Sequence, residues 1–230
     1  KDEAWAVGGK GSVFDPMRII ELSKNLEARQ RESPENLYTA GNLKWSNELW
    51  NINPKLRRRG EFCSVYFEPL TEAELLREDE YTLREYHPLP VDQRNMALRF
   101  GRDEAGNLLP PPVFLNTLGA DPTSHAEASE VIEGSTNSYW VMNRYNEALD
   151  MAKQKVASKI FMYEYYARPE SPDDSFDDLL KLIIYTGALS AVESNASTFA
   201  TNLMSEGLGN YMLVNDLNGI PTIWKRWMGM

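Results

Sequence analysis

The feature that most constrains the fold is the segment SPDDSFDDLLKLIIYTGA at residues 171–188. Ser171 suits the N-cap of a helix, Pro172 suits the first helical position, and Asp174 lies three residues after the cap. Gly187 marks the end, as glycine commonly does after the last helical turn. One apolar stripe follows helical spacing: Phe176, Leu179, Leu180, Ile183 and Ile184. The segment therefore predicts a capped helix with one apolar face, and its first-turn aspartates suit the helix dipole rather than catalysis.

The segments on either side of this helix predict strands and one more helix. Three β-like stretches precede it, two of them rich in aromatic residues: 113–119, 138–145 and 159–166. After it, LSAVESN (189–195) predicts a short strand that ends in Glu193. A second helix is expected at about 196–206 and another strand at 211–214. This order is typical of a mixed α/β sheet with helices on its faces.

The first half of the chain is less regular. It predicts one helix and three short pieces, two of them β-like and the last a helical turn with a capping-box spacing: 15–30, 37–45, 61–70 and 71–78. Turn-rich connections follow up to residue 112. We therefore expect a small irregular α+β segment or linker at 1–110 and a regular domain at 111–230.

Composition limits the chemistry. The chain of 230 residues holds one cysteine, Cys63, and two histidines, His87 and His125, which argues against cysteine-rich zinc sites and multi-histidine metal centres. A metal site would have to use carboxylates and a hard cation such as Mg²⁺ or Mn²⁺. No run of about 18 apolar residues predicts a membrane span, and no signal peptide is visible.

Charge argues against a protein that binds nucleic acid through its overall potential. The net charge is −10, so binding to phosphate would rest on local basic patches such as KLRRR at residues 55–59. A short basic run of this kind is more often a solvated loop. The stretch VGGKGS at residues 7–12 lacks the spacing of a phosphate-binding loop and predicts a flexible turn.

Two carboxylates occupy equivalent positions in the expected sheet. Asp121 follows the apolar run 113–119, and Glu193 ends the strand after the main helix. Strand ends of such sheets converge on one rim, and two carboxylates brought close stay ionised when a divalent cation lies between them. Asp121 followed by Pro122 also fits an ordinary turn, and 34 acidic residues give many chance pairs, so both interpretations stay open at this point.

The second half resembles the nuclease domain of phage large terminase subunits, most closely those of crAss-like and related large tailed phages. LGADP with HAEAS is similar to the family's first acidic strand and loop, and STNSYWVMNRY to its next strand. YYARPESPDDSFDDLLKLIIYTGA is similar to its Arg-Pro and helix, and LSAVESN to the strand with the second acid. The opening DEAWAV…SVFD is also similar to the segment that closes a terminase ATPase domain.

The resemblance implies a ribonuclease H-like fold and a Mg²⁺- or Mn²⁺-dependent endonuclease that cleaves double-stranded concatemeric DNA during viral DNA packaging. It implies Asp121 as the first metal ligand and Glu193 as the second. The implied partners are the terminase ATPase domain, the small terminase subunit and the portal, and the implied location is the host cell cytoplasm.

The sequence departs from the family in two places. Ala126 stands where related sequences often have Asp, and the family's third acid lies on a late helix, whereas this chain ends at Met230. Asp216 is the available substitute but lies early. We therefore expect the domain to be incomplete at its C-terminal end and the fragment to be weak or inactive.

An alternative is a catalytically inactive structural or interaction module of the packaging machine on the same fold. The missing third acid and the negative net charge favour this alternative, and the ordered strands and acids favour the nuclease. Two further residues are considered for the site. Glu164 is expected to be paired or solvent-facing, and His125 is expected to be a loop residue without a catalytic role.

Overall fold

The computed structural model describes residues 38–76, 82–122, 137–143, 160–167, 171–192, 197–215 and 221–223, with the single residues 24 and 169. The chain divides into two units, residues 1–39 and 40–230, and the second contains nearly all of the described residues. The predicted helix at 15–30 and the VGGKGS turn lie outside the described residues.

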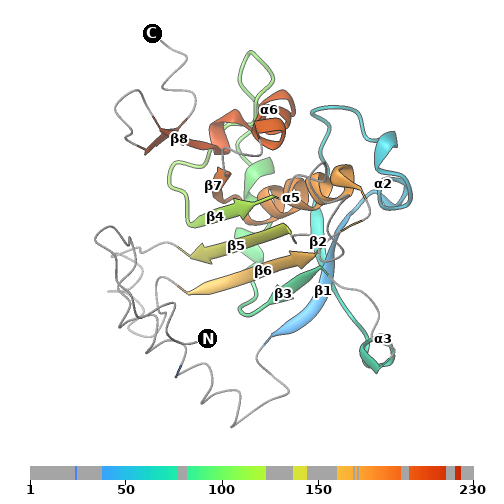
Figure 1. The fold of residues 1–230 in the computed structure, drawn as a ribbon. Coiled ribbons are helices and arrows are strands. Elements are labelled where there is room, and N and C mark those ends of the chain that lie inside the picture. The colour runs from blue at the N-terminus through green and yellow to red at the C-terminus, as the bar shows by residue number, and fades with distance from the viewer. Residues whose placement is uncertain are drawn as a thin grey trace, which may run out of the picture. The chain divides into compact units, whose positions relative to one another are not determined.

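Seven strands of this unit form one sheet in the order β2-β1-β3-β6-β5-β4-β7 (Figure 1). Their bounds are β1 Thr39–Trp45, β2 Val65–Pro69, β3 Leu83–Glu85, β4 Asn116–Asp121, β5 Asn137–Asn143, β6 Phe161–Ala167 and β7 Leu189–Val192. Two short strands, β8 Leu213–Asn215 and β9 Pro221–Ile223, pair separately. Strands from both sides of residue 110 therefore belong to one sheet, while the expected division at 110 and 111 stays a prediction.

The sheet is mixed. β4, β5 and β6 form an antiparallel meander, and β7 pairs with β4 in parallel. β1 and β2 form an antiparallel pair, as do β3 and β6. Beyond β7, Met212 makes a parallel bridge to Ser190. The predicted mixed α/β sheet with flanking helices is confirmed.

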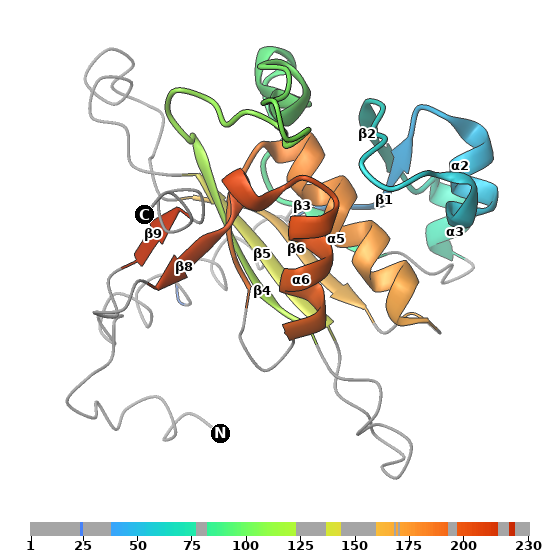
Figure 2. The same ribbon diagram turned by 90° about the horizontal axis from the view of Figure 1, so that it is seen from above.

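The helices are α2 Glu48–Ile52, α3 Glu72–Leu76, α5 Pro172–Thr186 and α6 Ser197–Ser205, with short 3-10 turns η2 Pro54–Leu56, η3 Val91–Gln93, η4 Met96–Leu98 and η6 Gly209–Tyr211. The views in Figures 1 and 2 place α5 and α6 over one face of the sheet, and the rings of Phe176 and Phe199 meet between these two helices.

The predicted chemistry of α5 is present in detail. The Ser171 hydroxyl accepts a hydrogen bond from the Asp173 N–H at 3.1 Å, and Pro172 is the first helical residue. Gly187 adopts φ 59°, a left-handed conformation that glycine reaches without strain, and its N–H donates to the Ile183 carbonyl oxygen. The capping box of α3 is also confirmed, because Thr71 and Glu74 exchange side-chain and backbone hydrogen bonds.

The core lies between α5 and the sheet. Every second residue of these strands points into the core. Tyr139 of β5 stacks on Tyr165 of β6 with ring centroids 4.6 Å apart. Tyr163 meets Tyr185 of α5 edge to face at 5.9 Å. These four tyrosines are almost fully buried, and they add aromatic contacts to a core that α5 fills mostly with leucine and isoleucine side chains.

Two strand boundaries differ from the sequence prediction. β4 begins at Asn116 rather than 113, because residues 110–112 are three prolines that lack backbone donors, and Val113 is exposed. The predicted strand at 211–214 begins instead as the 3-10 turn η6, and its strand β8 spans 213–215.

Candidate functional site

The end of β4 presents the first predicted metal ligand. Along this strand Leu118 and Ala120 are buried against the core, whereas Gly119 and Asp121 are exposed on the opposite face. Asp121 is the last residue of β4, so it belongs to the strand rather than to the turn after it. The alternation of the strand therefore directs its carboxylate away from the core.

β4 and β7 end at the same edge of the sheet. Ala120 of β4 pairs with Val192 of β7 in the parallel register, and Asp121 is the residue that follows Ala120 on β4. On the other strand, the next residue in sequence is Glu193, which lies outside the described residues. The structure therefore brings together the two strand ends that were predicted to carry acids, and the position of the second acid itself stays a prediction.

The face around Asp121 is open over β4. A Cβ built on Gly119 would meet no heavy atom within 4 Å. On the neighbouring strands, Ser138 is directly opposite Asp121, and Tyr166 is opposite Ser138. Trp140, opposite Gly119, is 42% exposed, and Tyr166 is 56% exposed. An approaching molecule would meet one carboxylate and two aromatic side chains on this face.

Several other predicted residues cannot be placed. His125, Ala126 and Asp216 lie outside the described residues, as does Glu193. Within the part of the chain that is described, no three His, Cys, Asp or Glu side chains gather as a metal-binding group. The same part contains no helix that is long and apolar enough to cross a membrane.

Glu164 is paired, as expected. Its carboxylate lies 3.0 Å from the Arg84 guanidinium nitrogen Nη1 and accepts a hydrogen bond from the Tyr86 hydroxyl at 2.7 Å. Burial, together with the hydrogen bond to Glu164, raises the pKa of Tyr86 to about 12. Glu164 therefore links β3 and the turn after it to β6. Through Trp140 of β5 it is level with Gly119 of β4, which comes two residues before Asp121.

The basic run at residues 55–59 is divided between surface and interior. Lys55, Arg58 and Arg59 are exposed and remain available to an anion, but the Arg57 side chain is only 8% exposed. Its guanidinium lies against the rings of Trp45 and Phe62, with centroid distances of 5.9 and 5.6 Å. One member of the expected patch is therefore part of the internal structure.

Arg57 forms a bidentate ion pair with Glu206, the residue that follows α6. The nitrogen–oxygen distances are 2.8 and 3.0 Å, and the Gly60 N–H also donates to Glu206 at 2.7 Å. Burial alone would raise the pKa of the Glu206 carboxyl, but the hydrogen bonds and charge of Arg57 and the bond from Gly60 lower it below its ordinary value. The pair therefore links the 48–62 segment to the end of α6.

Asp177 of α5 extends this internal network. It accepts a bond from the indole N–H of Trp45 at 3.2 Å and lies 2.9 Å from the Lys181 ammonium and 3.9 Å from the Arg57 Nε. The Lys181–Asp177 pair is local, at i,i+4, but the partners of Trp45 and Arg57 are more than a hundred residues away in sequence, and no sequence pattern indicates them.

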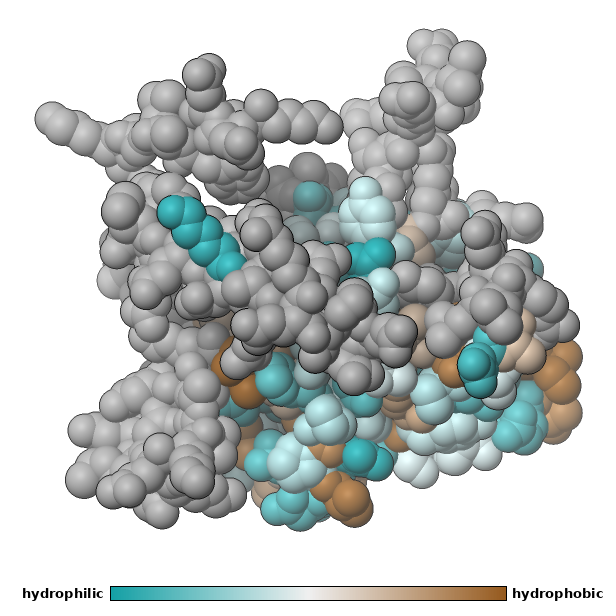
Figure 3. All heavy atoms as spheres, turned by 90° about the horizontal axis from the view of Figure 1, so that it is seen from below, coloured by the Kyte–Doolittle hydropathy of each residue, from teal (hydrophilic) through white to brown (hydrophobic). Residues whose placement is uncertain are grey.

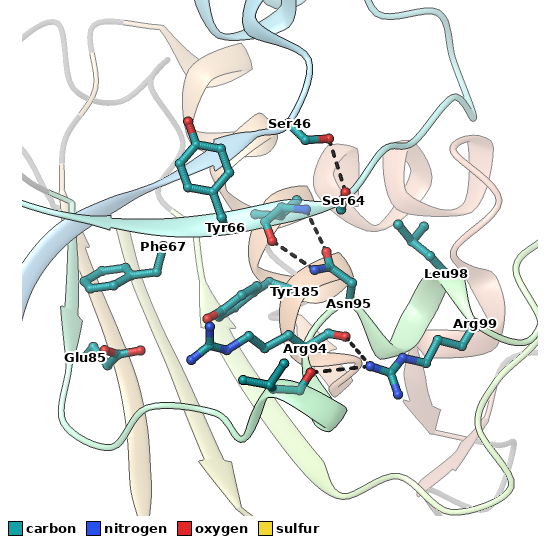
Figure 4. A pocket seen from close by; sticks show the side chains of 12 residues that line it. Ser46, Ser64, Tyr66, Phe67, Glu85, Arg94, Asn95, Leu98, Arg99 and Tyr185 are labelled. Carbon is teal, nitrogen blue, oxygen red and sulfur yellow. Dashed lines mark hydrogen bonds between the residues drawn. The ribbon is translucent and has the colours of Figure 1, made fainter.

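A second polar site was not anticipated from the sequence. A cavity of about 620 Å³ opens beside β2, the loop that carries η3 and η4, and the last turn of α5 (Figure 4). Glu85, Arg94 and Arg99 are its charged residues, and Tyr66, Phe67 and Val91 supply apolar surface. The sequence around Arg94 showed only a turn-rich connection, which carries no signal for a binding site.

Exposed large apolar side chains come from several segments, and three of them, Leu49, Ile52 and Leu56, lie close together in sequence at α2 and η2. The space-filling view in Figure 3 shows hydrophilic and hydrophobic residues interspersed over the described surface on that side. The most exposed large apolar residues are Ile52 and Val91, at 80% and 75%, and they come from separate segments of the chain.

Comparison of the chain with protein-family models, with curated proteins and with solved structures gave no match in any of the three.

Proposed function

We propose that this protein is a metal-dependent endonuclease of ribonuclease H-like fold, the nuclease portion of a viral DNA-packaging terminase. The observation that carries the proposal is the shared end of two parallel strands. Asp121 ends β4, Ala120 pairs with Val192 of β7, and the residue after Val192 in sequence is an acid. Acidic residues at adjacent strand ends can hold divalent cations of the kind that hydrolyse phosphodiesters.

The topology supports the finer fold assignment. A three-stranded antiparallel meander, β4 to β6, is followed by α5 and by β7, which returns in parallel beside β4. Then α6 leads to Met212, which bridges β7 on its far side, again in parallel. This succession of strand directions and crossover helices is the one expected of a ribonuclease H-like sheet.

The exposed carboxylate at the end of β4 fits a hard cation. Among the described residues, none engages Asp121 in a hydrogen bond or an ion pair. Carboxylate oxygens are the ligands that Mg²⁺ and Mn²⁺ prefer. When bound, such a cation supplies an activated water and stabilises the leaving oxygen of a phosphodiester. We propose that Asp121 and Glu193 hold it, because the parallel register that pairs Ala120 with Val192 makes them the next residues on the two strands.

The substrate and partners follow from the resemblance described above. We propose double-stranded concatemeric DNA as the substrate, in the cytoplasm of an infected host cell. The proposed partners are the ATPase domain, the small subunit and the portal. With a net charge of −10, the chain has to meet the DNA backbone through local cations. The exposed side chains of Lys55, Arg58 and Arg59 are candidates.

Two measurements test the proposal. The first is cleavage of supercoiled plasmid with Mn²⁺ or Mg²⁺ by a chain extended beyond Met230 to include a third acid, and the second is binding of Mn²⁺ by the 230-residue chain, followed by electron paramagnetic resonance. Asp121→Asn and Glu193→Gln should each abolish cleavage and weaken Mn²⁺ binding by about tenfold or more, which corresponds to about 1.4 kcal/mol. Each amide keeps the shape of the side chain but removes its negative charge. Asp92→Asn and Glu104→Gln, two exposed acids elsewhere, serve as matched controls and should change neither readout.

The two readouts separate the proposal from its alternative. Mn²⁺ binding that depends on Asp121 and Glu193 without cleavage would indicate an inactive module that retains the site. Cleavage that survives both substitutions, in a preparation purified to constant specific activity, would place the chemistry elsewhere and refute the proposed site.

A further inference from the structure

The cavity beside β2 is independent of the strand ends at Asp121. Its volume is about 620 Å³, within the range of sites that hold small molecules. Its lining includes Tyr66, Phe67, Glu85, Val91, Arg94 and Tyr185. They come from β2, β3, the loop that contains η3 and η4, and α5, so folding alone brings them together (Figure 4).

The loop that forms one wall is held at several points. The Leu89 N–H donates to the Tyr163 hydroxyl at 3.0 Å, and the Asn95 N–H donates to the Tyr185 carbonyl oxygen at 2.8 Å. The Asn95 side chain accepts from the Val65 N–H at 2.7 Å and donates to the Val65 carbonyl oxygen at 3.0 Å. It thus pairs with β2 as a short backbone segment would.

Asn95 reaches these partners with φ 54°, in the left-handed region where asparagine is tolerated better than most residues. A residue in this conformation persists only when its surroundings fix it. The wall is therefore formed before any ligand arrives, which lowers the entropic cost of binding.

The backbone of this loop also orients the side chain of Arg94. Its Nε donates to the Leu89 carbonyl oxygen at 3.0 Å, and Arg99 donates to the carbonyl oxygens of Arg94 and Val91 at 3.1 and 3.5 Å. In Figure 4 the dashed lines of Arg99 end on the loop backbone, while the guanidinium of Arg94 extends along the cavity. No described residue bonds the two terminal nitrogens of Arg94, which can therefore bind a carboxylate in a fork.

A negative group faces the same cavity. The Glu85 Oε1 accepts a hydrogen bond from the Tyr163 hydroxyl at 2.8 Å, and Oε2 has no partner among the described residues. Glu85 and Arg94 do not form an ion pair within 4.0 Å, although both charges affect the pKa of the Tyr185 hydroxyl. Burial raises the pKa of Tyr185, the Arg94 charge opposes that rise, and the Glu85 charge adds to it. The cavity therefore holds two opposite charges that do not pair with each other.

We propose that this cavity binds a free α-amino acid with an apolar or aromatic side chain. Its carboxylate pairs with Arg94, its ammonium group pairs with Glu85, and its side chain lies against Tyr66, Phe67 and Val91. A phosphate or a dicarboxylate fits less well, because Glu85 would repel the second negative charge and Nη2 of Arg99 already donates to two backbone carbonyl oxygens. A cation fits less well because Arg94 and Arg99 both lie at the cavity.

The test uses the 230-residue chain and three related probes in isothermal titration calorimetry. L-phenylalanine carries both charges, 3-phenylpropanoate lacks the ammonium group, and 2-phenylethylamine lacks the carboxylate. The expected result is binding of L-phenylalanine at least tenfold tighter than of either analogue. Arg94→Gln and Glu85→Gln should each weaken binding of L-phenylalanine at least tenfold. Arg58→Gln and Glu104→Gln make the same charge changes on exposed residues and should leave it unchanged.

Circular dichroism and thermal melting check that each variant is folded. If Arg94→Gln fails this check, Arg94→Lys keeps the charge but loses the fork, and it should also weaken binding. No binding of L-phenylalanine overturns the proposal. Equal affinity for 3-phenylpropanoate overturns it too, since the site would then recognise only an anion. Unchanged affinity in a folded Arg94 variant would show that the amino acid binds elsewhere.

Discussion

The buried pair of Arg57 and Glu206 allows a quantitative prediction for Glu206→Gln. The substitution keeps a carbonyl oxygen that can accept from the Gly60 N–H or from Arg57, and it changes the size of the side chain very little. What it removes is the negative charge 2.8 Å from an arginine that is 8% exposed. The variant therefore isolates the electrostatic contribution from packing.

The expected magnitude follows from burial. Removing one partner of a buried ion pair costs about 3–5 kcal/mol, because the remaining charge stays desolvated without compensation. Asp177 lies 3.9 Å from the Arg57 Nε and retains part of the compensation. We therefore expect a loss at the lower limit, about 3 kcal/mol, and a fall of about 6–12 °C in melting temperature for a protein of this size.

Urea unfolding followed by tryptophan fluorescence measures the loss, because Trp45 is buried beside this network. The control is Lys44→Met. Lys44 pairs with Glu68 at 3.9 Å with side chains 36% and 55% exposed, and such a pair contributes about 0–1 kcal/mol. A loss for Glu206→Gln no larger than that of Lys44→Met would refute the reasoning. The double variant Arg57→Met with Glu206→Leu should lose less than the sum of its single variants.

Two further predictions concern pH and a glycine. The folded state lowers the pKa of Glu206 below its ordinary 4.5, so the stabilisation is present above pH 4.5 and is lost as the pH falls through the folded pKa. The urea midpoint of the wild type should therefore fall more steeply below pH 4.5 than that of Glu206→Gln, and parallel curves would contradict this. Gly187→Ala should cost about 2 kcal/mol or more in unfolding free energy, because φ is +59° and the new Cβ would lie 2.7 Å from the Met96 Cβ. Gly119→Ala meets nothing within 4 Å and should change stability by less than about 0.5 kcal/mol, and equal losses in urea unfolding would argue against the steric explanation.

The parts of the fold that the sequence predicted are those set by local chemistry. The bounds of α5 follow from Ser171, Pro172 and Gly187, whose capping roles depend only on neighbouring residues. β5 and β6 were predicted within two residues of their observed bounds, because their aromatic and alternating patterns are local as well. The sharing of one sheet by β1, β2 and β3 was not predicted, since pairing across the sheet is decided by long-range contacts.

The candidate sites also differ in how much of each could be predicted from local sequence. The edge position of Asp121 follows from an apolar run that ends in an acid, and a sequence displays that pattern directly. The partner of Arg57 is Glu206, and nothing in the basic run 55–59 indicates which of its charges turns inward. The cavity needs Glu85 from β3, Arg94 from the loop and Tyr185 from α5, and their convergence exists only after folding.

The parallel pairing of β4 with β7 has a consequence for synthesis of the chain. β4 receives β5 on one side as soon as the following hairpin has emerged, but its other side is covered only by β7. At about 5–20 residues per second, the roughly 70 residues between these two strands take on the order of 4–14 s to translate. During that interval the backbone donors and acceptors on one side of β4 are a free edge that a second nascent chain can join. Polysomes that produce this protein therefore present a recurring opportunity for strand exchange, and the interval closes when α5 folds over the sheet and delivers β7.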